Sequence, residues 1–359
     1  MKHSILGGIG AAILLGACGG GGGGATGSGA SQPPATPAVP APAPAPAPAP
    51  TIYRLPVRSA LDVASYRAIN TALPGPLKFT SYHTDAATST SASGAALMSF
   101  TATDTRSYGN AIELNTSGGL VQDFSVGVDH ACRYAPVYFA VPASVAAGTS
   151  WDNSATKTCT SSYQTLKYDV RSQGGFVAFE AVTIGTGTYD TVKLHYVETI
   201  KSTTSSDTID RIEWRDLITG LVVKSTVNEL ATNSSPQTTN SFTQDLELIG
   251  YTQAASGRSK PNVERYVGSW WGTFVDAGIS NGPCSLKLAG SGSITGYCPG
   301  QGFTNWQVAG TVNAEGAATM NLIANGLPNR TFTGTFTPLA AAGTWVSATG
   351  SGSWKLTHD

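Results

Sequence analysis

Charge is scarce in this sequence. Only 12% of its 359 residues are Asp, Glu, Lys or Arg, and 21 basic residues nearly balance 22 acidic ones. A nearly neutral chain has no electrostatic reason to bind nucleic acid or an acidic membrane surface. Low charge combined with 42 glycines and many Ser and Thr residues is typical of an exported all-β protein rather than a cytoplasmic enzyme.

Long hydrophobic runs are also absent. A membrane-spanning helix needs roughly 20 apolar residues, whereas the apolar run at residues 5–15 is short and diluted by glycine. Lys2 gives this region a positive start, so residues 1–17 have the layout of an export signal peptide.

The end of this segment, Leu15-Gly16-Ala17-Cys18, resembles the lipobox of bacterial lipoproteins. The resemblance implies that Cys18 carries a diacylglyceryl thioether and an acylated amine, and that it becomes the N-terminus. Two or more acyl chains hold a protein stably on a membrane, so the lipid anchor should be firm. Gly19 stands where an inner-membrane retention Asp would sit, which implies the outer membrane. The alternative is an ordinary secretory signal with an incidental Cys18.

Residues 18–50 form a tether after the signal peptide. The first part is almost all Gly, Ala, Ser and Thr, and the second is Pro and Ala. Neither part can bury enough apolar surface to offset the entropy of ordering it. We expect a flexible coil followed by a polyproline II spacer of roughly 30 Å. A Pro-rich run can also bind aromatic grooves, but a spacer fits its place beside a lipid anchor better.

The remaining chain of about 310 residues is long enough for two domains with their own cores. A polar break at residues 256–261 marks the boundary. We expect one β domain at residues 51–252, a linker at 253–262 and a second β domain at 263–359.

Cysteine is rare, with five in the chain, and lipidation of Cys18 leaves four. Four cysteines allow three pairings, and the periplasm is oxidising enough to keep disulfides. Cys284 and Cys298 flank a Gly-Ser-Gly tip, so a symmetric hairpin puts them directly opposite each other. The second predicted pair, Cys132–Cys159, follows by elimination.

Residues 51–252 alternate apolar and polar side chains with a period of two, as in Val192, Leu194 and Tyr196. This pattern predicts antiparallel strands. The run at residues 176–184 is apolar on both faces, which predicts a central strand. Loosely spaced apolar residues at 60–72 predict one short helix.

Four segments of this domain occur in an order that resembles a loose group of uncharacterised bacterial envelope proteins. They are Gly148-Thr149-Ser150-Trp151, residues 183–193, Trp214 with residues 220–224, and Glu247-Leu248-Ile249-Gly250-Tyr251. Relatives of that group fold as curved antiparallel sheets akin to the half-barrels of periplasmic lipoprotein carriers. The resemblance implies an open, apolar-lined sheet for a lipid-like ligand. The alternative is that these apolar residues only form a core.

A phrase of Gly followed two residues later by an aromatic or β-branched residue recurs in residues 263–359. Examples are Gly272-Thr273-Phe274, Gly334-Thr335-Phe336 and Gly343-Thr344-Trp345. It suits a tightly curved sheet, and the alternating runs predict a small up-and-down barrel of about eight strands. The domain is similar in style to avidin-like and lipocalin-like barrels, although the phrase carries over no ligand residue.

Five of the seven tryptophans lie in this domain. Trp270, Trp306 and Trp345 are candidate ligand contacts, which could stack on a sugar or line the barrel mouth. The preferred interpretation is structural, with tryptophans filling the barrel and with Trp271 and Trp354 closing its first strand against its last.

No catalytic, metal or cofactor motif is found. The sequence contains no Gly-x-Ser-x-Gly elbow and no phosphate loop, and its histidines lack metal-site spacing. His195 points outward from an amphipathic strand. Asp152, Glu180 and Asp216 are carboxylates that could meet only through the fold. We therefore expect no cofactor.

The sequence favours an outer-membrane lipoprotein, facing the periplasm or the cell surface, that acts as a non-enzymatic binding or scaffold module. Its expected partners are the membrane, through the lipid, and an apolar small molecule, an envelope protein or a glycan. A surface adhesin-like or solute-capturing lipoprotein is the alternative, and an envelope hydrolase is a distant one.

Overall fold

The computed structural model describes residues 52–54, 61–73, 77–90, 96–102, 110–114, 120–125, 130–233, 239–276, 279–280, 283–299, 305–324 and 326–358. Strands and their turns account for nearly all of them, which confirms the expected all-β class. Within these ranges, no helix is long and apolar enough to cross a membrane. The predicted signal peptide, Cys18 and the tether lie outside the described residues.

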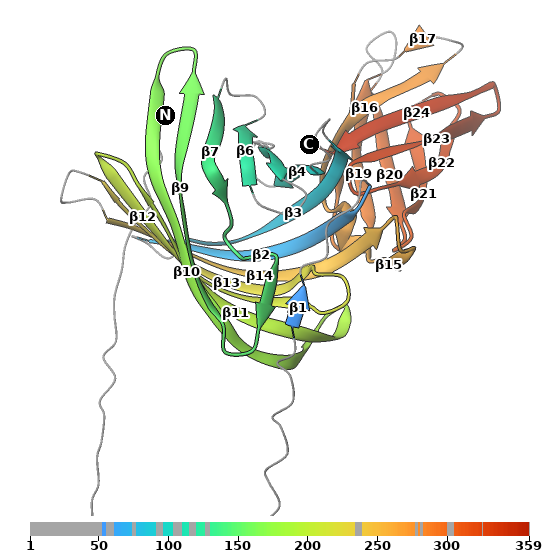
Figure 1. The fold of residues 1–359 in the computed structure, drawn as a ribbon. Helices are drawn as coiled ribbons and strands as arrows, with labels where there is room; N and C mark the ends of the chain where they lie inside the picture. Colours follow the sequence, from blue (N-terminus) through green and yellow to red (C-terminus); the bar gives the residue numbers. More distant parts are fainter. Residues whose placement is uncertain are drawn as a thin grey trace, which may run out of the picture. The chain divides into compact units, whose positions relative to one another are not determined.

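The first sheet is a large antiparallel meander (Figure 1). Its strands are β2 (Val63–Leu73), β3 (Leu77–Thr90), β4 (Ala96–Ala102), β5 (Asn110–Leu114), β6 (Leu120–Ser125), β7 (His130–Tyr138), β9 (Ser150–Ser161), β10 (Thr165–Ile184), β11 (Gly187–Lys201), β12 (Ser205–Asp216), β13 (Val222–Asn233), β14 (Thr239–Gln253) and β15 (Arg258–Lys260). Neighbours in sequence are mostly neighbours in the sheet. The predicted antiparallel sheet is therefore confirmed.

The order of strands in this sheet is circular. β14 pairs with β2 on one side and with β13 on the other, so the pairing returns to its start after twelve strands. β15 adds to β14 as an extra edge strand, at residues 258–260 of the predicted linker. The half-barrel expectation implied an open edge, and the second pairing of β14 joins the two ends instead.

The predicted helix at residues 60–72 is wrong, because this segment forms β2. Ala64, Tyr66, Ala68 and Asn70 are all buried on one face of the strand. That is a period of two, and pairing with both β3 and β14 satisfies the backbone hydrogen bonds that a helix would otherwise make internally.

The prediction of a central strand at residues 176–184 is also wrong for this half of β10, although β10 as a whole lies between β9 and β11. β9 pairs with β10 only as far as Gly175, so the second half of β10 has β11 as its only partner strand. Val177 and Phe179 are 49% and 37% exposed there. An apolar run thus marks a partly uncovered edge.

A short two-stranded sheet packs against the large one. β1 (Ile52–Arg54) pairs with β8 (Ser144–Ala146). Their buried residues Tyr53 and Val145 form one cluster with Val192, Leu194 and Tyr196 of β11. The predicted alternation in β11 is thereby confirmed, and the side of the large sheet that Tyr53 and Val145 contact is termed the inner face.

The C-terminal sheet is a closed antiparallel barrel, drawn in orange to red in Figure 1. Its strands are β16 (Gly268–Asp276), β18 (Cys284–Leu288), β19 (Ser293–Pro299), β20 (Asn305–Val312), β21 (Ala317–Ile323), β22 (Arg330–Phe336), β23 (Ala340–Ser347) and β24 (Gly350–His358), with β17 (Ile279–Ser280) attached to β16. A 3₁₀ turn, η1 (Val263–Tyr266), precedes it. β16 pairs with β24, which confirms the predicted eight-stranded up-and-down barrel.

Glycines allow close approach within this barrel. Gly334 and Gly343 lie opposite each other on β22 and β23, and the indole of Trp354 packs over both. A Cβ at Gly343 would overlap the carbonyl oxygen of Thr333 and lie 2.7 Å from Trp354 Nε1. The recurring Gly phrase therefore marks places where the backbone must remain bare.

Candidate functional site

The inner face of the large sheet contains a buried ionic network. Arg211, Glu213 and Arg215 alternate along β12, so all three side chains point to the same face. Glu213 is only 3% exposed. Its carboxylate accepts hydrogen bonds from Tyr196 Oη at 2.7 Å, from Arg215 Nε at 2.8 Å and from Arg211 Nη1 at 3.4 Å. Every part of the Glu213 carboxylate is thus engaged.

The ionisable groups of this network keep fixed protonation states near neutral pH. Burial alone would raise the pKa of Glu213, but Arg215 and Arg211 outweigh burial and hold that pKa below its usual value. Burial raises the pKa of Tyr196 well above its usual value, so its phenol stays neutral. None of these groups is poised to exchange a proton near neutral pH. The arrangement holds charge in place and is unsuited to acid–base catalysis.

Two buried polar atoms on the same face have no hydrogen-bond partner among the described residues, and two half-buried carboxylates lie near them. Arg211 Nε and Ser225 Oγ are buried without a partner, and Ser225 lies in register with Glu213. The two carboxylates are Asp207 and Glu229, on β12 and β13. Buried polar groups are almost always hydrogen-bonded, so Arg211 Nε and Ser225 Oγ mark a place where a ligand or an ordered water would bind.

Glu229 lies in an apolar setting within this group. It pairs in register with Ile209 on one side and Phe242 on the other. Burial raises its pKa, and the nearby Asp207 carboxylate adds to that shift, while Arg211 opposes it. Burial also raises the pKa of Asp207. These two carboxylates have no compensating cation of their own.

The inner-face patch defined by Arg211, Arg215, Glu198, Asp207, Glu213 and Glu229 therefore has two cations against four carboxylates. Glu198 accepts a hydrogen bond from Tyr138 Oη at 2.8 Å, and Glu213 is paired with the two arginines. Within the described ranges, no group of three or more His, Cys, Asp or Glu side chains is arranged to hold a metal ion. The patch carries more carboxylates than cations.

The sequence did not single out this patch. Its signal is the alternation Arg211-Ile212-Glu213-Trp214-Arg215, which places three charges on one face of a strand. The matching face of β11 is apolar, at Leu194 and Val192, in register with Glu213 and Arg215. Charges opposite an apolar strand face would have indicated a buried network.

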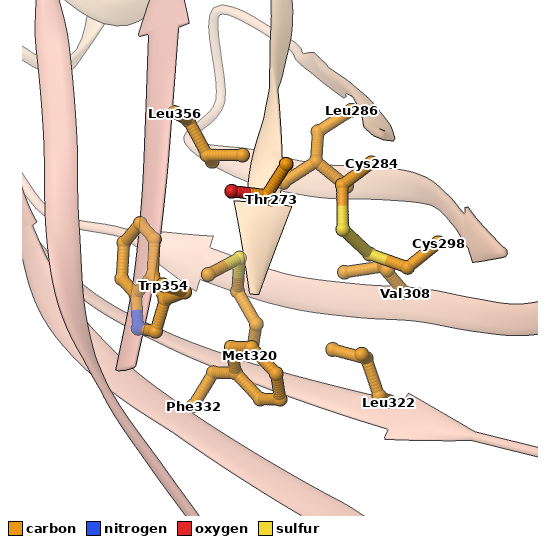
Figure 2. A pocket seen from close by; sticks show the side chains of 10 residues that line it. All are labelled: Thr273, Cys284, Leu286, Cys298, Val308, Met320, Leu322, Phe332, Trp354 and Leu356. Carbon is orange, nitrogen blue, oxygen red and sulfur yellow. A yellow bond between two sulfur atoms is a disulfide. The ribbon is translucent and has the colours of Figure 1, made fainter. Parts of the chain in front are cut away.

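One small cavity lies among the described core side chains of the barrel. The cavity in Figure 2 has a volume of only about 10 Å³. That is roughly the space that a single water molecule needs. Met320, Phe332, Trp354 and the Cys284–Cys298 disulfide are among the side chains that line it. A lipid or sugar does not fit this space.

The three candidate ligand contacts are core residues of the barrel. Trp270, Trp306 and Trp345 are 0%, 3% and 1% exposed. The guanidinium of Arg330 lies over the rings of Trp306 and Trp345, at 4.7 and 4.4 Å. These contacts favour the structural role that the sequence analysis preferred.

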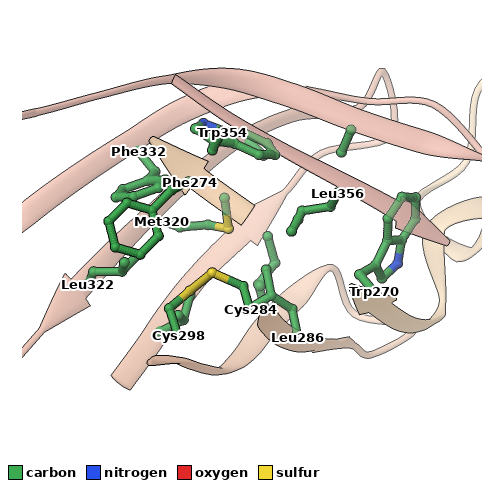
Figure 3. Packing of buried hydrophobic residues seen from close by; sticks show 14 of the residues in the cluster. Trp270, Phe274, Cys284, Leu286, Cys298, Met320, Leu322, Phe332, Trp354 and Leu356 are labelled. Carbon is green, nitrogen blue, oxygen red and sulfur yellow. A yellow bond between two sulfur atoms is a disulfide. The ribbon is translucent and has the colours of Figure 1, made fainter. Parts of the chain in front are cut away.

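Packing around these residues is aromatic. Figure 3 shows Phe274 and Phe332 together with Met320 near Trp354, and the disulfide in the same cluster. Trp345 Nε1 donates to Val275 O at 2.8 Å, and Trp354 Nε1 donates to Thr333 O at 3.1 Å. The indole N–H groups are thus used to hold strands together.

Both predicted disulfides are present in the structure. Cys284–Cys298 joins β18 to β19, whose register also places Leu288 opposite Ile294 as the hairpin analysis expected. Cys132–Cys159 joins β7 to β9, and the two residues lie opposite each other in the sheet.

The scattered carboxylates named from the sequence do not meet. Asp152 pairs with Arg171, Glu180 accepts a hydrogen bond from Trp214, and Asp216 caps its own turn by accepting from the N–H and hydroxyl of Thr219. His195 is half exposed, as expected, and contacts Asp210 at 2.7 Å. Each has a structural partner.

The described residues form an all-β protein of three sheets, with a short two-stranded sheet, a large sheet in which twelve strands pair in a circle, and an eight-stranded barrel. The sequence matches no protein-family model and no curated protein.

Solved structures with some likeness include the hypothetical lipoprotein YmcC from Escherichia coli, which is 9% identical over 54% of this chain and 89% of that one, with a TM-score of 0.29. A candidate lipoprotein from Parabacteroides distasonis is 12% identical over 55% and 97%, also with a TM-score of 0.29. A Trp-176-Ala mutant of Transferrin Binding Protein B from Haemophilus parasuis is 9% identical over 85% and 77%, with a TM-score of 0.18. All these TM-scores lie below 0.5, so the likenesses support no inference about function.

Proposed function

We propose that this protein is a lipid-anchored cell-envelope lipoprotein that binds a small ligand without transforming it. The lipobox at residues 15–18 supports the anchor, and Gly19 favours the outer membrane. The inner-face patch supports binding, because its unpartnered groups gather on two neighbouring strands, β12 and β13. That gathering is the single observation that carries the proposal.

The ligand is a polar molecule with a cationic group. Asp207 and Glu229 leave two negative charges uncompensated, and Phe242 beside Glu229 provides an aromatic face for an ammonium. Arg211 Nε and Ser225 Oγ provide hydrogen-bonding groups further along the strands. A purely apolar ligand would leave all of these polar groups desolvated and unpaired.

The fixed protonation states of Glu213 and Tyr196 disfavour the hydrolase alternative. A hydrolase needs a group that takes up and gives up protons near its working pH. The lowered pKa of Glu213 and the raised pKa of Tyr196 make both unsuited to that role, which leaves only Asp207 and Glu229 of this patch as groups that could serve it. A panel of chromogenic esters and glycosides tests this directly, and turnover of any of them would contradict the proposal.

Native mass spectrometry tests for a bound ligand. The mature chain is exported with Cys18→Ala to keep it soluble and is measured before and after mild denaturation. We expect an extra mass that is released on unfolding and that contains an amine.

A titration with spermidine as the probe tests the ligand class. The raised pKa values of Asp207 and Glu229 mean that both take up protons early as the pH falls, so binding should weaken from pH 7 to pH 5. Glu229→Gln should weaken binding at pH 7. Asp152→Asn is the matched control, since this exposed carboxylate is paired with Arg171, and it should leave binding unchanged. Binding of palmitate instead of spermidine, unaffected by Glu229→Gln, would contradict the proposed ligand class.

A further inference from the structure

His358, at the end of β24, makes an unusual pair of contacts. Its Nδ1 lies 2.7 Å from the carbonyl oxygen of Pro338, and its Nε2 lies 3.0 Å from the carbonyl oxygen of Val267. Both distances are within the range of a hydrogen bond. The two ring nitrogens therefore face two carbonyl oxygens, which can only accept hydrogen bonds.

A neutral imidazole cannot satisfy both contacts. It has one N–H and one bare nitrogen, and the lone pair of the bare nitrogen would face a carbonyl lone pair. Only the doubly protonated ring donates to both oxygens. We infer that His358 is held as an imidazolium cation that latches the closing seam of the barrel.

The ring of Trp270 supports the charged form. The imidazole of His358 stacks on it at 4.4 Å between ring centres and 6° between planes, and Trp270 is fully buried. An indole face attracts a cation, and the attraction is stronger where water is excluded. Trp270 is itself fixed, since its Nε1 donates to Tyr266 O at 2.9 Å.

The latch joins three parts of the barrel. Val267 lies between η1 and β16, Pro338 lies in the turn between β22 and β23, and His358 ends β24. The backbone N–H of His358 also donates to Leu339 O at 3.1 Å. β16 and β24 are the first and last strands, and their pairing closes the barrel. The proton on His358 thus stabilises the closure itself.

Other ionisable groups on the elements around His358 are engaged elsewhere. On η1, Glu264 pairs with Arg67, Arg265 donates to Thr252, and burial raises the pKa of Tyr266 so that its phenol stays neutral. On β24, Lys355 is exposed on the outer side of the barrel. Asp359, which follows His358, lies outside the described residues.

The direction in which barrel stability changes with pH depends on which protonation state of His358 the folded protein favours. An ordinary histidine has a pKa of about 6.5 and is mostly neutral at pH 7.5. If the folded protein favours protonated His358, the stabilisation is complete below about pH 6.5, where the unfolded chain is protonated too. The stabilisation is lost as the pH rises to the value at which the folded protein releases the proton. The barrel should therefore be less stable at alkaline pH.

Nitrogen NMR of the mature Cys18→Ala chain labelled with ¹⁵N-histidine reads the protonation state directly. We expect both ring nitrogens of His358 to show the imidazolium pattern at pH 7.5. One protonated and one bare nitrogen at that pH would overturn the inference. His358 is unchanged in this chain, so the answer does not depend on whether a His358 variant folds.

His358→Phe keeps an aromatic ring on Trp270 but removes both donors. We expect the midpoint of barrel unfolding to fall by roughly 5 °C at pH 6 and the difference from the parent chain to shrink toward pH 9. His195→Phe is the matched control, because His195 is half exposed and contacts Asp210 in the other sheet. An equal loss at both pH values would show that His358 contributes only packing, which would also overturn the latch.

Discussion

Glu213 shows at the scale of single residues why position matters more than residue type. It and Asp152 are both carboxylates beside arginine on a β-strand. Asp152 is about half exposed, and water screens its pair with Arg171. Glu213 is buried between Arg211 and Arg215, so losing its charge would leave two arginines without their anion.

Glu213→Gln should lower the free energy of unfolding by about 3–5 kcal/mol, the usual cost of removing one partner from a buried ion pair. Chemical denaturation at pH 7 measures this change. Asp152→Asn is the control and should leave the midpoint unchanged. A Glu213→Gln chain as stable as its parent would show that the network contributes nothing to stability.

The same network also predicts an acid dependence. The pKa of Glu213 is held below its ordinary value of about 4.3, so its contribution is complete above that pH and is lost as the pH falls toward the folded-state pKa. The stability difference between the parent chain and Glu213→Gln should shrink in acid. A difference that grew on acidification would contradict the low pKa.

At the scale of elements, glycines without a side chain allow the tight curvature of the barrel. β22 and β23 pass each other at Gly334 and Gly343, and Trp354 fills the space above both. A flat sheet would tolerate alanine at these positions, whereas a tightly closed one does not. The tryptophan and the two glycines therefore form one packing unit.

Gly343→Ala should destabilise the barrel by about 1–3 kcal/mol, the usual cost of overpacking. Its new methyl group would overlap the Thr333 carbonyl oxygen, which belongs to the backbone and cannot swing aside. Thermal unfolding followed by tryptophan fluorescence measures the loss. Gly350→Ala is the control, since a Cβ there would lie 3.7 Å from Trp345, an ordinary contact. Equal midpoints for the two variants would refute the packing account.

At the scale of the whole molecule, the proposed anchor and the proposed binding face have separate roles. The predicted lipobox at residues 15–18 lies outside the described structure, and the patch belongs to β11, β12 and β13. Ligand binding should therefore survive release from the membrane. The tether at residues 18–50 would then set only how far the β domains reach.

Cys18→Ala should shift the protein from the membrane pellet to the soluble fraction, because the acyl chains are its expected hold on the bilayer. Fractionation followed by immunoblotting measures this shift. If the variant stayed in the pellet, the lipid-anchor prediction would be wrong. Protease shaving of intact cells then separates display on the surface from display in the periplasm.

Much of the fold could be predicted because strand patterning is local. Alternation in β11, the hairpin around Ser291 and the Gly phrase each depend on residues close together in the chain. The two errors, at residues 60–72 and 176–184, have a common cause. The spacing of apolar residues indicates which side chains are buried. Whether the segment becomes a helix, a central strand or an uncovered edge depends on the other segments that pack against it in the fold.

The sequence by itself determined the all-β class, the Cys284–Cys298 pair and the eight-stranded barrel, since each follows from short-range period and register, and Cys132–Cys159 followed by elimination. Only the tertiary structure decided that β14 joins the ends of the large sheet, that Glu213 is enclosed by two arginines and that His358 meets Val267 and Pro338. The three charges of β12 are close in sequence and only their burial depends on the fold, whereas the β14–β2 pairing and the His358 contacts join separate segments of the chain. Their energies depend on burial and on charges brought together by folding, which no local pattern encodes.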